Sequence, residues 1–151
     1  MVRVVIDAFV FVRALLNRRS LWGTLVFDRA DEYRLVVSSV IAAEVTDVLS
    51  RSELARRFRN QSGASVDTVL AILASAEWIA PDPPPRISRD PKDDIYPATA
   101  AAAAAAFVVS EDRDLLDIGA DEGVRIIDAE AFLRCSTRPC LWPDDRLPRR
   151  L

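Results

Sequence analysis

Four acidic side chains lie just after an expected strand or near the start of an expected helix. Asp7 follows the apolar run "VVI", and Glu44 lies early in an otherwise apolar helical segment. Asp94 opens an alanine-rich segment, and Asp112 follows "FVVSE". Carboxylates gathered in one crevice repel each other, so a protein normally tolerates them only where a cation or a shared proton offsets the repulsion. Oxygen ligands suit Mg²⁺ or Mn²⁺, and either ion supports phosphodiester hydrolysis without histidine.

The two later acids also have purely structural explanations and close rivals. An acid in the first turn of a helix is stabilised by the helix dipole by about 0.3–1 kcal/mol, which accounts equally for Asp94 and for Asp93 beside it. Asp112 in "SEDRD" can be a turn residue, with Glu111 and Asp114 as alternative ligands. The sequence leaves these alternatives open.

The two earlier acids differ in how easily a structural role explains them. Glu44 lies between Ala43 and Val45 in an apolar helix, where a solvated position and a functional one fit equally well. Asp7 lies between "VVI" and "AFVFV". A carboxylate in such apolar surroundings is hard to explain as solvated surface, because ionised groups are seldom buried without a partner. Asp7 is therefore the strongest single candidate.

The absence of histidine narrows the possible chemistry. The chain has 151 residues, no histidine and a net charge of −3. This composition excludes Ser-His-Asp and Cys-His catalysis, histidine-based RNA cleavage and His-ligated zinc. All but one of the basic residues are arginine, so binding to nucleic acid would depend on local arginine patches rather than on overall charge.

Length and composition indicate one soluble domain. Half of the residues are hydrophobic, and no apolar run reaches the roughly 18–20 residues that a membrane span needs. The first residues lack the features of a secretory signal, so we expect a cytoplasmic protein. We assign residues 1–135 to the domain and residues 136–151 to an irregular, proline-containing tail. Cys135 and Cys140 match no zinc spacing, and we expect spare thiols, with a local disulfide as the alternative.

Five apolar or β-branched runs alternate with helical segments, which is typical of an α/β fold with a mainly parallel sheet. The expected strands are Val2–Ile6, Arg34–Ser39, Glu77–Ala80, Phe107–Ser110 and Val124–Ile127. In an open parallel sheet, ligands bind beyond the carboxyl ends of the strands. The four acids all fall at that end of the expected sheet.

Capping residues and apolar periodicity predict the helices. The residues at positions typical of helix caps are Ser20, Ser38 or Ser39, Ser65 and Asp128. The alanine-rich segment 93–106 is expected to form one buried helix, which tolerates Pro97 only in its first turn. We also expect a short basic helix over 52–60 and core positions for Trp22 and Trp78.

The order and spacing of these motifs resemble those of the PIN domain, in particular the bacterial VapC-type toxins of toxin-antitoxin pairs. The resemblance runs from Val2 to about Leu133, and its most specific part is "DPKDD" followed by an alanine-rich helix and "VVSEDRDLL". It implies a three-layer α/β sandwich with a central five-stranded parallel sheet, and a Mg²⁺- or Mn²⁺-dependent endoribonuclease. It also implies an RNA substrate, a cognate antitoxin and a homodimer.

The same resemblance assigns roles to individual residues. The implied catalytic acids are Asp7, Glu44, Asp94 and Asp112. The implied metal ligands among them are Asp7, Asp94 and Asp112, and the supporting residues are Ser110, Asp93 and Asp114.

Ala8 and Phe9 depart from the family pattern, because family members usually carry a hydroxyl residue and often an asparagine after the first aspartate. Loss of hydrogen-bonding neighbours of a metal ligand typically lowers metal affinity or activity 10- to 100-fold. The departure motivates a second hypothesis, a PIN-fold module whose chemistry has lapsed and which binds a protein or RNA partner. Aspartyl-phosphate chemistry is a third hypothesis, disfavoured because Phe9 stands where a phosphatase needs a second aspartate.

RNA contacts are expected from arginines, whose forked guanidinium suits phosphate groups. The candidates are Arg13, Arg56, Arg57 and Arg59. The alternative for the segment 52–60 is a solvated helix face on which Glu53 and Arg57 form an ion pair.

Overall fold

A six-stranded sheet with the order β3-β2-β1-β4-β6-β5 forms the centre of the computed structural model, which describes residues 1–51, 64–81 and 91–136. The strands are β1 (Arg3–Ile6), β2 (Arg34–Val37), β3 (Glu77–Trp78), β4 (Phe107–Val109), β5 (Ala120–Asp121) and β6 (Val124–Ile127). Neighbouring strands from β3 to β6 are parallel, whereas β5 pairs antiparallel with β6. The expected five-stranded parallel sheet is confirmed, and a short sixth strand extends it at one edge.

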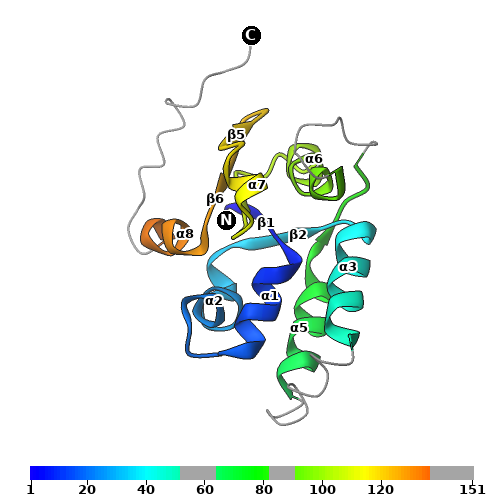
Figure 1. The fold of residues 1–151 in the computed structure, drawn as a ribbon, viewed down its shortest axis with the longest axis vertical. Helices are drawn as coiled ribbons and strands as arrows, with labels where there is room; N and C mark the ends of the chain where they lie inside the picture. Colours follow the sequence, from blue (N-terminus) through cyan, green and yellow to red (C-terminus); the bar gives the residue numbers. More distant parts are fainter. Residues whose placement is uncertain (52–63, 82–90, 137–151) are drawn as a thin grey trace.

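Helices cover the sheet on both sides. They are α1 (Ala8–Leu16), α2 (Leu21–Gly23), α3 (Ser39–Ser50), α5 (Ala64–Ser75), α6 (Ile95–Ala102), α7 (Arg113–Leu116) and α8 (Ala129–Ser136). In Figure 1, α1, α2 and α5 lie below the central strands and α6 lies above them. This arrangement confirms the three-layer α/β sandwich.

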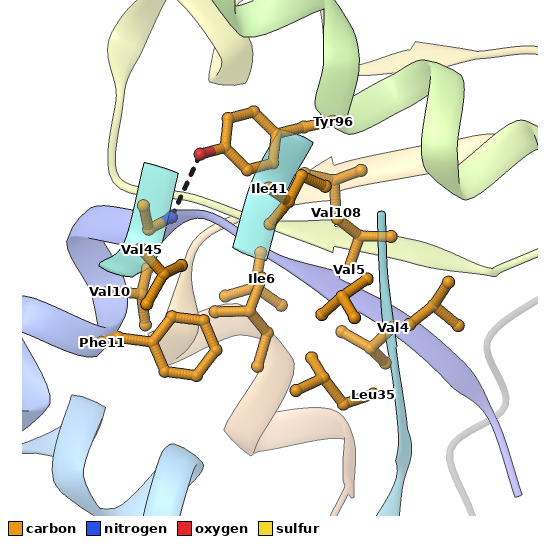
Figure 2. Packing of buried hydrophobic residues seen from close by; sticks show 14 of the residues in the cluster. Val4, Val5, Ile6, Val10, Phe11, Leu35, Ile41, Val45, Tyr96 and Val108 are labelled. Carbon is orange, nitrogen blue, oxygen red and sulfur yellow. Dashed lines mark hydrogen bonds between the residues drawn. The ribbon is translucent and has the colours of Figure 1, made fainter. Parts of the chain in front are cut away.

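Strand β1 lies in the middle of the hydrophobic core. Val4, Val5 and Ile6 are each no more than 1% exposed, as expected for a continuous β-branched run that is covered on both faces of a parallel sheet. Figure 2 shows these residues packed with side chains of α1 and α3, including Phe11 and Ile41. The buried strand β1 therefore places Asp7, the residue that follows it, at the carboxyl edge of the sheet.

The strand order places a topological switch point between β1 and β4. From β1 the chain continues to β2 and β3 on one side, and it later returns to the other side of β1 as β4. The loops that leave the carboxyl ends of two such neighbouring strands run in opposite directions and leave a crevice between them. The segments after β1 and β4, which carry Asp7 and Asp112, therefore meet at this crevice.

The alanine-rich helix is shorter than the sequence predicts. Helix α6 ends at Ala102 rather than at Ala106, and Ala104 adopts the left-handed conformation with φ of 52°. The Ala105 and Ala104 amides donate to the Ala100 and Ala101 carbonyls, which is the hydrogen-bond pattern of a Schellman helix end. The chain must reverse here because β4 begins at Phe107. Pro97 lies in the first turn of α6, as expected.

The predicted helix caps, and the helices that they begin, are confirmed in part. Ser20, Ser38 and Asp128 cap helices through their side-chain oxygens, as predicted. The segment that Ser20 caps is not one regular helix, because a π-helix over Thr24–Asp28 and a 3₁₀ turn over Ala30–Glu32 follow α2. Helix α5 begins at Ala64, so Ser65 belongs to the helix itself.

The expected core position of Trp78 is wrong. Its side chain is 52% exposed on the edge strand β3. The expected basic helix over 52–60, the tail beyond residue 136 and Cys140 lie outside the described residues. Among the described helices, none is both long and apolar enough to cross a bilayer.

Candidate functional site

Asp7 is held in place by the junction between β1 and α1. Its backbone is extended and it caps α1, because its Oδ1 accepts a 3.2 Å hydrogen bond from the Phe9 amide. Its own amide donates to the Val109 carbonyl of β4 at 2.9 Å. The side chain is 3% exposed. The capping role and a functional role are therefore compatible, since the second carboxylate oxygen takes no part in the cap.

The second oxygen of Asp7 is bound by Ser110. The Ser110 hydroxyl donates to Asp7 Oδ2 at 2.7 Å, and Ser110 is fully buried. Burial raises the pKa of Asp7 above its ordinary value, the hydrogen bonds from Ser110 and Phe9 oppose that rise, and the negative charges of Glu44 and Asp112 add to it. The carboxylate of Asp7 is thus placed where a nearby cation would relieve both its desolvation and its repulsion.

Asp112 begins a second capped turn beside Asp7. Its amide donates to Ser110 Oγ at 3.0 Å, and its Oδ1 accepts from the Asp114 amide at 2.9 Å, which caps α7. A single serine hydroxyl therefore links the two acids, because it donates to Asp7 and accepts from the backbone of Asp112.

Asp93, Asp112 and Asp114 form a group that could hold a metal ion. One carboxylate oxygen from each lies within 4.8 Å of the other two, and all three residues are partly exposed. Three oxygen donors at this spacing, with a fourth carboxylate, Asp7, near enough to interact electrostatically with Asp112, fit Mg²⁺ or Mn²⁺. The donor set does not suit zinc, which prefers nitrogen and sulfur ligands.

Asp94 is not one of the three residues whose carboxylate oxygens form that group. Asp94 is 3% exposed at the start of α6, and its side chain makes no capping hydrogen bond to that helix. Of the two neighbouring aspartates that the sequence left as alternatives, Asp93 is the one whose carboxylate joins Asp112 and Asp114.

Glu44 lies on α3 and is held by Tyr96. The Tyr96 hydroxyl donates to Glu44 Oε2 at 2.7 Å and accepts from the Ala8 amide at 3.3 Å. Burial raises the pKa of Tyr96, and the charges of Asp7 and Glu44 raise it further, so the hydroxyl keeps its proton. Sequence reasoning missed Tyr96, although a tyrosine in the first turn of an apolar helix is a signal, because a buried hydroxyl needs a partner.

Glu111, a rival of Asp112 in the sequence, has a structural role. Its Oε1 accepts from the Trp22 indole nitrogen at 2.9 Å and from the Ala129 amide at 3.1 Å.

The Arg13 guanidinium stacks on Trp22, 4.9 Å from the ring centroid, and Arg13 is exposed. Arg13 is therefore linked through Trp22 to the segment that carries Asp112, whereas Arg56, Arg57 and Arg59 lie outside the described residues.

Comparisons with known proteins agree with the fold. The sequence profile of the PIN domain matches residues 3–114, most of the chain. No match is found among curated protein sequences. Among solved structures, the fold is similar to a chain of VapBC2 from Rickettsia felis bound to a DNA fragment from their promoter, with a TM-score of 0.52 and 14% sequence identity. That match covers 82% of this chain and 96% of the other.

The profile match spans β1, which precedes Asp7, and continues through the segment that carries Asp112 and Asp114. The residues that the fold brings together at the switch point are thus within the matched region. The chain belongs to the PIN domain family.

Proposed function

We propose that the protein is a metal-dependent endoribonuclease and the toxin component of a toxin-antitoxin pair. The observation that carries the proposal is the group of Asp93, Asp112 and Asp114, whose carboxylate oxygens lie within 4.8 Å of one another beside the buried Asp7. Like charges at this spacing are costly unless a cation neutralises them.

The proposed roles follow from where each acid lies. Asp112 and Asp114 would hold Mg²⁺ or Mn²⁺ with Asp7, and geometry favours Asp93 over Asp94 as the contribution from the segment before α6. A bound divalent ion would polarise the scissile phosphate and make water a better nucleophile at neutral pH. Glu44, which accepts from Tyr96 through Oε2, would use its other oxygen to accept a proton from the attacking water.

Ser110 supports the enzyme hypothesis over the lapsed-module hypothesis. The side chains of Ala8 and Phe9 offer Asp7 no hydrogen bond, which motivated the idea of a lapsed site. Asp7 is nevertheless bonded on both oxygens, by the Ser110 hydroxyl and by the Phe9 amide. Polar support for the first aspartate therefore comes from Ser110, the residue that follows β4, and from the backbone.

The proposed partners follow from the same function. Arg13, exposed and stacked on Trp22, is a candidate phosphate contact for an RNA strand at the crevice. An antitoxin partner is supported by the similarity in fold to a chain of VapBC2. We expect a homodimer, which light scattering of the purified chain would test.

Calorimetric titration with Mn²⁺ separates the two hypotheses. An enzyme site binds Mn²⁺ in the wild type and loses most of that affinity in Asp112→Asn, whereas a lapsed module binds the metal equally weakly in both. Cleavage of single-stranded RNA by the purified, antitoxin-free protein then tests the activity itself. A wild-type protein that binds Mn²⁺ and cleaves no RNA would contradict the ribonuclease proposal.

A further inference from the structure

Tyr96 connects three segments that contribute to the crevice. Its ring is 1% exposed within α6, and Figure 2 shows it beside Ile41 and Val108 with its hydroxyl directed toward the start of α1. The hydroxyl contacts Glu44 of α3 at 2.7 Å and the amide of Ala8, the first residue of α1, at 3.3 Å. The dashed line in Figure 2 marks the bond that the Ala8 amide donates to this hydroxyl.

The direction of both hydrogen bonds is fixed by chemistry. The Ala8 amide can only donate, so the Tyr96 oxygen is the acceptor in that bond. The single hydroxyl proton of Tyr96 is then available for Glu44, whose Oε2 accepts it. One oxygen of Glu44 is therefore fixed, and the side chain of this residue cannot turn freely on the surface of α3.

The contact to Ala8 completes the first turn of α1. The Phe9 amide donates to Asp7 Oδ1, and the Val10 amide donates to the Asp7 carbonyl. The Ala8 amide is the remaining donor of this turn, and it would lack a partner without Tyr96. The tyrosine thus also stabilises the backbone that orients Asp7.

We propose that Tyr96 is a positioning residue, whose hydroxyl fixes Glu44 and the start of α1 relative to each other, so that Glu44 and Asp7 keep their spacing at the proposed metal site. The inference rests on the proposed metal-dependent function. Tyr96 supplies from α6 a polar group that the side chains of Ala8 and Phe9 cannot supply from α1. Tyr96 itself does not touch the metal or the substrate.

Tyr96→Phe tests the proposal, with Tyr33→Phe as a matched control. Tyr33 is also buried and also donates from its hydroxyl, to the Leu25 carbonyl at 2.9 Å, but it packs against Phe132 of α8. We expect Mn²⁺ affinity, measured by calorimetry, to fall about 10- to 100-fold in Tyr96→Phe and to stay unchanged in Tyr33→Phe. Equal Mn²⁺ affinity in Tyr96→Phe and the wild type would overturn the proposal.

A double variant separates positioning from a general structural effect. In the background of Glu44→Ala, Tyr96→Phe should cause a smaller loss of Mn²⁺ affinity than it causes in the wild type, because only the contact with the Ala8 amide is left for the hydroxyl to make. If the loss of Mn²⁺ affinity in the double variant equals the sum of the losses in the two single variants, expressed as free energies, the inference is contradicted. If Glu44→Ala weakens binding and Tyr96→Phe does not, only the role of Tyr96 fails. If the wild type binds no Mn²⁺, the proposed function fails and this inference fails with it.

A measurement on the wild type covers the case in which Tyr96→Phe does not fold. The buried Tyr96 hydroxyl should give a slowly exchanging proton resonance that shifts in Glu44→Gln, and that also shifts when Mg²⁺ is titrated into the wild type. Saturation with Mg²⁺ that leaves this resonance unmoved would contradict the proposed coupling between Tyr96 and the metal site.

Discussion

The Ser110 hydroxyl donates a 2.7 Å hydrogen bond to Asp7 Oδ2, and sheet register explains why the two residues meet. Ile6 of β1 pairs with Val109 of β4 in parallel register. The residues that follow them, Asp7 and Ser110, therefore leave the sheet side by side. Because the same hydroxyl also accepts from the Asp112 amide, it sets the spacing between the two acids.

Ser110→Ala should weaken metal binding far more than it weakens the fold. The variant removes the donor to Asp7 and the acceptor for the Asp112 amide, and we expect about a 10- to 100-fold loss of Mn²⁺ affinity by calorimetry. Ser75→Ala, which removes an exposed hydroxyl near the end of α5, is the control and should bind Mn²⁺ like the wild type. Equal affinity in both variants would show that the hydroxyl has no part in the site.

Asp7→Asn should stabilise the metal-free protein while abolishing tight metal binding. Burial raises the folded-state pKa of Asp7, so its favourable contribution to stability is complete only below the unfolded-state pKa. That contribution is lost as the pH rises through the folded-state pKa. We therefore expect a higher urea midpoint for Asp7→Asn than for the wild type at pH 7 in EDTA, with the difference shrinking as the pH is lowered.

The Asp7 prediction has a second part in the presence of metal. Mn²⁺ should raise the urea midpoint of the wild type and leave that of Asp7→Asn nearly unchanged, because a ligand stabilises only the folded state that binds it. A metal-free Asp7→Asn variant that is less stable than the wild type at pH 7 would refute the assignment of Asp7 as a destabilising buried carboxylate.

Asp93→Asn should reduce Mn²⁺ affinity more than Asp94→Asn. Asp93 contributes an oxygen to the group with Asp112 and Asp114, whereas Asp94 is almost fully buried outside that group. We expect at least a tenfold loss for Asp93→Asn, and for Asp94→Asn an effect mainly on thermal stability. The reverse order of Mn²⁺ affinities would restore Asp94 as the metal ligand of this segment.

Ala104→Gly should stabilise the fold without affecting the site. Ala104 has φ of 52°, a conformation that costs a residue with a Cβ atom more than it costs glycine. After the entropy of the extra glycine in the unfolded chain is subtracted, we expect a gain of roughly 0.5–1 kcal/mol in the free energy of unfolding. Ala98→Gly, in the middle of α6, should lose about 1 kcal/mol. Equal thermal midpoints for the two variants would contradict this account.

Local patterns in the sequence predict most of the architecture. The apolar run before Asp7, the serine cap of α3 and the alternation of strands and helices each follow from neighbouring residues alone. The end of α6 could not be predicted in this way, because alanine favours a helix throughout the tract and only the need to enter β4 reverses the chain. Strand β5 was missed because two residues carry no recognisable period.

The site could be predicted only as a set of candidates. Spacing along the chain identifies Asp7 and Asp112, but it cannot decide between Asp93 and Asp94, since the choice depends on how the 3₁₀ turn over Pro91–Asp94 enters α6. The link between Tyr96 and Glu44 joins residues 52 positions apart, and no local pattern records it. Trp78 was misplaced because a large apolar residue on a short edge strand lacks a covering layer.

The most direct test is cleavage of a labelled single-stranded RNA by the purified, antitoxin-free protein, first in EDTA and then with Mg²⁺ or Mn²⁺ restored. We expect internal cleavage that requires the metal and falls at least about 100-fold in Asp112→Asn, because this acid lies in the three-carboxylate group and beside Asp7. Absence of cleavage by the wild type with either metal, or equal cleavage by Asp112→Asn, would contradict the proposed ribonuclease function.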